Sequence, residues 1–236
     1  FTGNTDCNID EETYPSTALS AYQWSSFAGA MTELSGGTAG PTGDDTHADV
    51  PIGFTFNYLG VDCTQLRINT NGWVSMDLSG PDMGSDVNNN LFFTAAPGTA
   101  LAPWWDNLKA DGSSAISYQS SGGVFTVEWK NILTYNADAT ARINFQVKLY
   151  KGTNVIEFWY GTATAGTHSD YESASIGIKD ATGGPGRFIE GTSGSTGTAK
   201  SCLESTTGWP AVNYRFSPPA SLGTETFWKV VVSKDA

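Results

Sequence analysis

The sequence predicts an all-β fold, an antiparallel two-sheet β-sandwich of jelly-roll-like form. Apolar and polar residues alternate along several short segments, which is the period of a strand with one buried face. Glycine is abundant, with 27 among 236 residues, and clusters rich in Gly, Ser and Asn separate these segments as turns. Long segments with a 3.6-residue apolar period are lacking, so we expect no helix beyond a turn or two in 92–96 or 104–108.

The alternation locates individual strands. Ile52–Tyr58 and Phe125–Trp129 each place every second side chain on one face. This pattern predicts six core side chains: Phe54, Phe56, Phe125, Val127, Phe145 and Val147. Further strands are expected at Tyr22–Phe27, Leu66–Met76, Ala115–Gln119, Ala174–Ile178, Asn213–Phe216 and Phe227–Val232. About ten strands in one chain fit two packed sheets.

The clearest hairpin joins Ile143–Tyr150 to Val155–Tyr160 through a four-residue loop. Counting back from this loop pairs Leu149 with Ile156, Lys148 with Glu157, and Gln146 with Trp159. Trp159 then lies on the outer face of the hairpin, beside Gln146 and Asn144. An aromatic ring flanked by amides is a candidate platform for a sugar ring or a partner surface. The alternative is that a loop, the tail strand or a neighbouring module covers it.

We expect residues 1–236 to form a single domain. Prolines in 217–220 suggest a linker, and 221–236 would add a C-terminal strand that either docks on the sandwich or opens a truncated neighbour. The first residues lack the basic start and apolar stretch of a signal peptide, which indicates a mature or trimmed chain.

The charge balance limits the partners. The net charge is −12, from 24 acidic and 12 basic residues, so nucleic acid and anionic membranes would be repelled. No apolar run is long enough to cross a bilayer, so membrane insertion is not expected. Other modules of the same polypeptide are expected partners.

The three cysteines fit one disulfide and one free thiol in a secreted protein. Cys7, Cys63 and Cys202 are too widely spaced for a zinc knuckle. We expect a disulfide between Cys7 and Cys202, because both lie near chain ends, which often meet, and we expect Cys63 to stay free. Three buried thiols are the alternative.

Acidic loop residues raise the question of calcium. Asp44, Asp45 and Asp49 lie close together before the first strong strand, and hard cations such as calcium take loop carboxylates as ligands. The spacing matches neither an EF-hand nor a calcium-binding nonapeptide repeat. Solvated loop acids are therefore the other interpretation.

Two short motifs have strong local signals: one predicts a turn and the other contains adjacent tryptophans. Asn71-Gly72 is a strong turn signal, because both residues tolerate positive φ. In Pro103–Asp106, the adjacent tryptophans should point to opposite faces of an extended segment. One would enter the core, and the other, with Trp105 as our candidate, would cover an edge or contact a ligand.

A set of segments within 22–218 carries a family resemblance: Ile52–Tyr58, Ile68–Trp73, Leu101–Leu108, Val124–Asn131, Asn144–Gly161 and Ser173–Ile178. Taken in order, they resemble a recurrent module of large secreted and surface proteins of Bacteroidota, many of them cargo of the type IX secretion system. Asn-Gly-aromatic, then Ala-Pro-Trp-Trp-Asp, then Asn-Phe-Gln-Val also resembles the nidogen-like domain of animal adhesive proteins. Both resemblances imply an extracellular or cell-surface β-rich module for interaction or spacing.

Catalytic motifs are lacking. The chain has no Gly-x-Ser-x-Gly elbow, His-Glu-x-x-His or phosphate loop, and His47 and His168 are weakly placed for a triad. We therefore expect a non-catalytic adhesion or interaction module that contacts a surface glycan or a protein. A carbohydrate-binding module of a secreted hydrolase is the alternative, and a glycoside hydrolase with two facing carboxylates is the third hypothesis.

Overall fold

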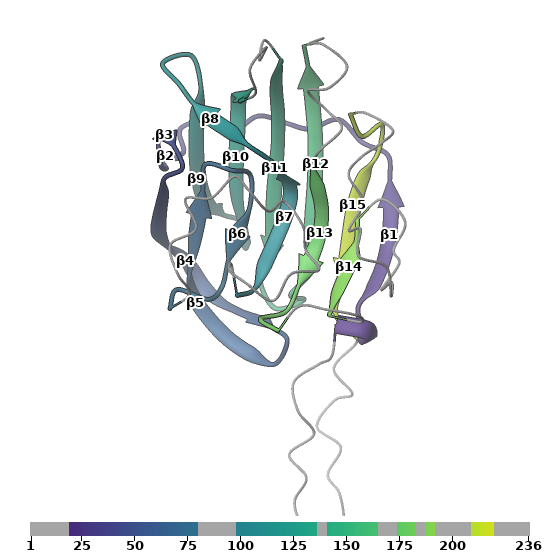
Figure 1. Ribbon diagram of the computed structural model, residues 1–236. Coiled ribbons are helices and arrows are strands. Elements are labelled where there is room, and N and C mark those ends of the chain that lie inside the picture. Colours follow the sequence, from purple (N-terminus) through teal and green to yellow (C-terminus); the bar gives the residue numbers. More distant parts are fainter. Residues whose placement is uncertain are drawn as a thin grey trace, which may run out of the picture.

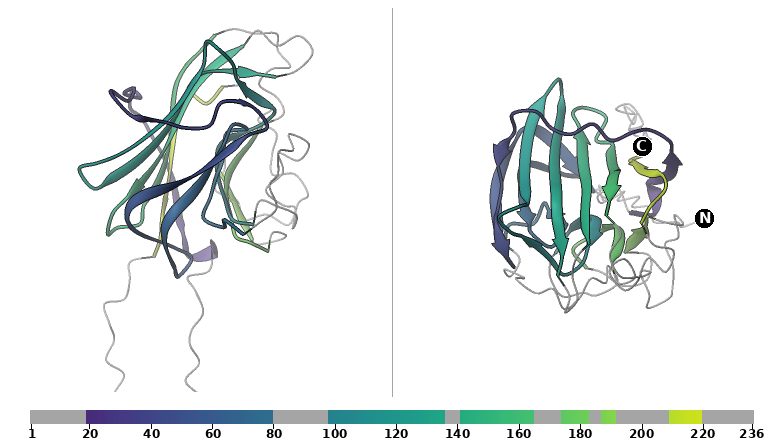
Figure 2. Two further views of the ribbon diagram at one scale, coloured as in Figure 1. Left: turned by 90° about the vertical axis from the view of Figure 1, so that its left-hand side faces the viewer. Right: turned by 90° about the horizontal axis from the view of Figure 1, so that it is seen from above.

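The computed structural model describes residues 19–79, 98–135, 141–164, 174–182, 187–191 and 209–219. Two antiparallel sheets face one another, as the two views in Figure 2 show. The larger sheet has nine strands and the smaller has six. The predicted β-sandwich is confirmed. Within the described ranges, helix is limited to the 3₁₀ turn Leu19–Ala21, which is too short to span a membrane.

Figure 1 labels the strands of both sheets. The larger sheet contains β1 (Gln23–Phe27), β2 (Thr38–Ala39), β3 (Gly43–Asp44), β8 (Leu108–Ala110), β9 (Ala115–Ser121), β10 (Val124–Thr134), β11 (Arg142–Tyr150), β12 (Ile156–Ala163) and β15 (Asn213–Ser217). The smaller sheet contains β4 (His47–Tyr58), β5 (Val61–Asn69), β6 (Val74–Ser75), β7 (Ala100–Trp105), β13 (Ser175–Lys179) and β14 (Phe188–Glu190). Its strand order is β14-β13-β7-β6-β5-β4, and the main path of the larger sheet is β1-β15-β12-β11-β10-β8-β3.

Most of the expected strands are present, and one of them is divided in two. The segment Leu66–Met76 is divided into β5 and β6 by the Asn71-Gly72 turn. The helical turn expected in 104–108 is wrong, because this segment contains the end of β7 and the start of β8. The expected strand Phe227–Val232 lies outside the described residues, as does 92–96.

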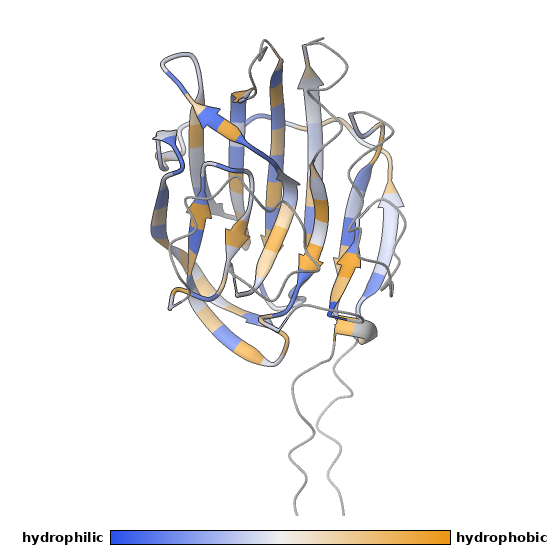
Figure 3. Cartoon of the chain, viewed as in Figure 1, coloured by the Kyte–Doolittle hydropathy of each residue, from blue (hydrophilic) through white to orange (hydrophobic). Residues whose placement is uncertain are grey.

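The core lies between the two sheets, and apolar residues alternate along their strands (Figure 3). Five of the six predicted core residues are completely buried: Phe56, Phe125, Val127, Phe145 and Val147. Phe54 is only partly buried. The reason is a break in the β4 register, because Pro51 pairs with Gln65 whereas Phe56 pairs with Cys63. The strand does not keep period two through this bulge.

The predicted hairpin register is confirmed. In the β11–β12 pair, Leu149 lies opposite Ile156, Lys148 opposite Glu157, and Gln146 opposite Trp159. The loop is closed by hydrogen bonds from Tyr150 N to Val155 O and from Asn154 N to Tyr150 O. Because the loop length fixes the register, it also fixes which side chains share the outer face.

The chain passes from one sheet to the other at a corner next to Asn71. β3 in the larger sheet is followed by β4 in the smaller one, and β7 in the smaller sheet is followed by β8 in the larger one. The fully buried Asn71 contacts both crossings. Its Oδ1 accepts a hydrogen bond from Leu108 N at 3.0 Å, and its Nδ2 donates to Asp45 Oδ1 at 2.8 Å. Its backbone carbonyl accepts from Asp106 N at 3.3 Å.

Gly72 completes this corner because no side chain fits there. Its φ is +79°, and a Cβ would lie 1.9 Å from the carbonyl oxygen of Trp104. Trp104 N donates to Gly72 O, so the two turns approach backbone to backbone. The Asn-Gly and Pro-Trp-Trp-Asp motifs, far apart in the sequence, therefore form one structural unit.

We predict that Gly72→Ala lowers the free energy of unfolding by more than about 3 kcal/mol, because it combines positive-φ strain with a backbone overlap. Gly36→Ala is the matched control. Gly36 has a φ of +77°, but a Cβ at this position would meet only open space, so its cost should be only about 1 kcal/mol. Urea unfolding of both variants checks this, and equal losses would contradict the proposed overlap.

Candidate functional site

The predicted Trp159 platform lies on the outer face of the larger sheet, and another part of the chain partly covers it. After β1, residues 28–37 run across this face to reach β2, as the view from above in Figure 2 shows. We call residues 28–37 the strap. The ring of Phe27, immediately before the strap, packs edge-on against the Trp159 ring with the centroids 5.0 Å apart. Trp159 is therefore partly covered, and its side chain remains partly exposed.

Hydrogen bonds fasten the strap to the sheet. Gln146 Nε2 donates to Thr32 O at 2.8 Å, and Leu34 N donates to Glu128 Oε2 at 2.9 Å. Asn213 Nδ2 donates to Gly29 O at 3.0 Å. Gln146 is completely buried and Glu128 is 1% exposed. These side chains form hydrogen bonds with backbone N–H and C=O groups of the strap, so they are engaged in holding the strap.

A second polar cluster lies beside the strap and is centred on Glu157. The Glu157 carboxylate is 2% exposed and accepts hydrogen bonds from Tyr150 Oη at 2.6 Å, Trp159 Nε1 at 2.8 Å and Arg215 Nε at 2.8 Å. Lys148 Nζ lies 4.3 Å from the centre of the Trp159 ring. Burial lowers the pKa of Lys148, and burial next to Glu157 raises the pKa of Tyr150. The indole N–H of Trp159 is thus bonded internally.

Asn144, the third residue of the predicted platform, supports a bulge. The φ of Asn131 is +54°, at the point where the β10–β11 register shifts between Trp129 and Ile132. Asn144 Oδ1 accepts a hydrogen bond from Asn131 N at 2.8 Å, and its Nδ2 donates to Thr162 O at 2.8 Å. Its amide therefore stabilises the irregular backbone of β10.

The three predicted calcium ligands have separate partners. Asp45 accepts from Asn71 at the sheet corner, Asp44 lies 3.8 Å from Lys109 Nζ, and Asp49 pairs with Arg67. In the described part of the chain, no group of three or more His, Cys, Asp and Glu residues is arranged to hold a metal ion.

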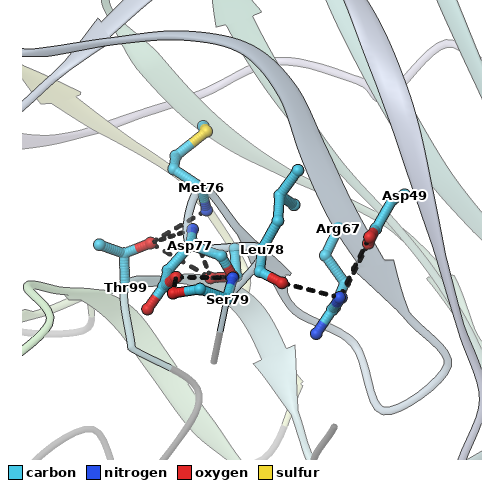
Figure 4. A network of polar contacts seen from close by, with 8 residues as sticks. Asp49, Arg67, Met76, Asp77, Leu78, Ser79 and Thr99 are labelled. Atoms are coloured by element: carbon cyan, nitrogen blue, oxygen red, sulfur yellow. Dashed lines mark hydrogen bonds and ion pairs between the residues drawn. The ribbon is translucent and has the colours of Figure 1, made fainter. Parts of the chain in front are cut away.

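Arg67 links Asp49 to the segment that follows β6, as the close view in Figure 4 shows. Its Nε donates to Asp49 Oδ1 at 2.8 Å and its Nη2 donates to Leu78 O at 3.1 Å. Next to this pair, Thr99 Oγ1 accepts from the backbone N–H groups of Met76 and Asp77. The network fixes the chain after β6 against the smaller sheet.

Both adjacent tryptophans are buried, and they face opposite sides of the smaller sheet. Trp104 belongs to the main core, whereas Trp105 packs at 6.1 Å from Trp73 in a second cluster with Ala100, Ala102 and Phe188. The opposite orientation is confirmed, but Trp105 is 1% exposed and does not present its ring to solvent. The β7–β13 register shifts at this point, because Gly177 pairs with Ala102 whereas Ser175 pairs with Trp105. This irregularity accompanies the outward turn of the second ring.

Of the three cysteines, only Cys63 lies among the described residues. Cys63 is a free thiol, half-buried next to the core, and burial raises its pKa. Cys7 and Cys202 lie outside the described residues, so their pairing stays a prediction.

Sequence reasoning missed a depression at the β4 bulge. It is lined by Pro51, Gly53, Phe54, Thr55, Thr64 and Gln65 and has a volume of about 370 Å³. The signal was Gly53, an isolated glycine in an alternating strand, which often marks a bulge. The φ of Gly53 is +87°.

We predict that Glu128→Ala releases the strap. Leu34 N loses its acceptor, so its amide hydrogen should exchange about tenfold faster or more, as expected for a lost hydrogen bond to a buried carboxylate. Glu33→Ala is the control, because Glu33 lies in the strap itself but its ion pair with Lys130 of β10 is exposed and should contribute little. An unchanged Leu34 exchange rate in Glu128→Ala would show that the carboxylate does not hold the strap.

We also predict that Asp49→Ala lowers the free energy of unfolding by about 1 kcal/mol at neutral pH, a small value because Asp49 is 38% exposed and solvent screens the pair. The Arg67 hydrogen bonds lower the pKa of Asp49 from its ordinary 3.8. Its stabilisation is therefore present above that value and is lost as the pH falls through the lowered pKa. Unfolding curves of the two proteins should converge in acid, and a pH-independent difference would contradict the ion pair.

Comparison with known proteins identifies the family. The model of a family described as NIDO related matches residues 21–227. Neither the curated proteins nor the solved structures contain a significant match. The family match supports the resemblance to the nidogen-like domain and an extracellular type of module. It spans most of the 236 residues, and the chain therefore belongs to the NIDO-related family.

Proposed function

We propose that the chain is a non-catalytic extracellular adhesion or interaction module of a larger secreted or cell-surface protein. The observation that carries this proposal is the pairing of the first and last strands of the sandwich. β1 and β15 are antiparallel neighbours, with Gln23 opposite Ser217 and Phe27 opposite Asn213. The chain thus enters and leaves the sandwich at one end (Figure 1), which suits a module that presents its opposite end to a partner.

At the opposite end, polar contacts hold the β8–β9 turn against strands β10 and β11. Arg142, at the start of β11, forms two hydrogen bonds to Asp111 in the β8–β9 turn, at 2.9 and 2.6 Å. Arg142 holds the pKa of Asp111 well below its usual range. Ser114 Oγ donates to Asn131 O at 2.8 Å and so ties the turn to β10. Pre-ordered turns lose less entropy on binding, which favours recognition.

The state of the two most deeply buried carboxylates, Glu128 and Glu157, supports a non-catalytic role. A glycosidase needs two carboxylates facing the substrate across a cleft. Glu128 and Glu157 are 1% and 2% exposed, and both are used to hold strap or sheet partners. The carbohydrate-binding alternative does not need such a cleft.

The proposed origin in Bacteroidota surface proteins rests on the sequence resemblance.

The test measures binding and turnover with the full chain. We expect surface plasmon resonance against purified extracellular proteins and cell-surface polysaccharides to give saturable binding. Polysaccharides and peptides incubated with the chain should show no hydrolysis above the buffer rate. Any hydrolysis above the buffer rate would contradict the proposal, and its loss in Glu128→Gln or Glu157→Gln would identify these carboxylates as catalytic.

A further inference from the structure

A depression lies at the β4 bulge and is lined by residues of β4 and β5. Four residues of β4, 52–55, lie between the pairs Pro51–Gln65 and Phe56–Cys63, whereas β5 has only Thr64 between them. The extra residues bend the strand away from its partner. The resulting space of about 370 Å³ is within the size range of small-ligand sites, roughly 300–1,000 Å³.

The bulge also brings β4 against the larger sheet. A Cβ on residue 53 would lie 3.0 Å from Ser120 Oγ of β9. Glycine at this position therefore allows the two sheets to approach and leaves the depression unfilled. Phe54, which the alternation would have placed fully in the core, is instead partly exposed and packs against the core.

The lining combines two apolar surfaces with neutral polar groups. Pro51 and Phe54 supply the apolar part, and Thr55, Thr64 and Gln65 supply two hydroxyls and an amide. None of these six lining residues is charged, although the protein has a net charge of −12. An ionic ligand would find no counter-charge in this lining, and an anion would also be repelled by the protein as a whole.

The polar side chains of the lining are available for a ligand. Thr55, Thr64 and Gln65 are exposed, and their side chains form no hydrogen bond with other described residues. The outer face of the larger sheet differs in this respect, because Gln146, Glu157 and Trp159 are bonded internally. The depression therefore offers donors and acceptors that the Trp159 platform does not.

We propose that this depression binds a neutral saccharide. A sugar ring has an apolar face that can pack on Phe54 and Pro51, and hydroxyls that can exchange hydrogen bonds with Thr55, Thr64 and Gln65. The site is shallow and solvated, so affinity for a single ring is weak and a chain of several sugars is the better ligand. This inference rests on the proposed interaction module and names the ligand class of its carbohydrate-binding form.

The experiment uses calorimetry on the full chain with neutral cello-, manno- and chito-oligosaccharides, and with a uronic acid oligosaccharide as the charged comparison. The double variant Thr64→Ala/Gln65→Ala removes polar groups from exposed positions, so folding should be unaffected. Thr38→Ala/Gln23→Ala is the matched control, since both residues are exposed on strands β2 and β1. We expect at least a tenfold weaker affinity in the first variant and no change in the control.

Amide chemical shifts provide a second readout. A bound neutral oligosaccharide should shift the signals of Thr55, Thr64 and Gln65 more than those of the strap. Binding that survives Thr64→Ala/Gln65→Ala, or that the uronic acid oligosaccharide matches, would overturn this site. No binding of any neutral oligosaccharide would also overturn it. Saturable binding to purified proteins alone would then leave the interaction module intact, so the two proposals fail separately.

Discussion

The hydrogen bonds of Asn71 join two of the four places where the described chain changes sheets, and the corner between the two sheets depends on them. A two-sheet fold must turn its corners without leaving backbone groups unpaired in the core. Asn71 supplies an acceptor to Leu108 on one crossing and a donor to Asp45 on the other. Gly72 permits this geometry by allowing the backbone of Trp104 to approach. The Asn-Gly motif thus has a structural explanation in this chain.

The polar side chains on the outer face of the larger sheet also have a structural explanation. Charged and amide side chains on a sheet suggest a binding surface, yet here the strap covers them and uses them as hydrogen-bond partners. Burying Glu157 is tolerable because three donors surround its carboxylate. The depression at the β4 bulge, by contrast, has an uncharged lining, and its polar side chains are exposed to solvent.

Local sequence patterns predicted those structural features that depend on residues close together along the chain. The fold class, the hairpin register of Gln146 and Trp159, and the burial of Phe56 and Phe145 all followed from period two and loop length. Coverage of Trp159 did not, because Phe27 and the strap reach it across a long separation in sequence. The exposure of Phe54 did not either, since a bulge shifts the period without a strong local signal other than one glycine.

The most direct test of the corner is a swap of its donor and acceptor, measured as the free energy of unfolding at neutral pH. Asn71→Asp keeps the acceptor for Leu108 N but sets a carboxylate against Asp45, so it should be strongly destabilising. Adding Asp45→Asn restores a donor between the two side chains, and the double variant should recover most of the loss. An Asn71→Asp protein as stable as the original, or a double variant with no recovery, would contradict the role given to this residue.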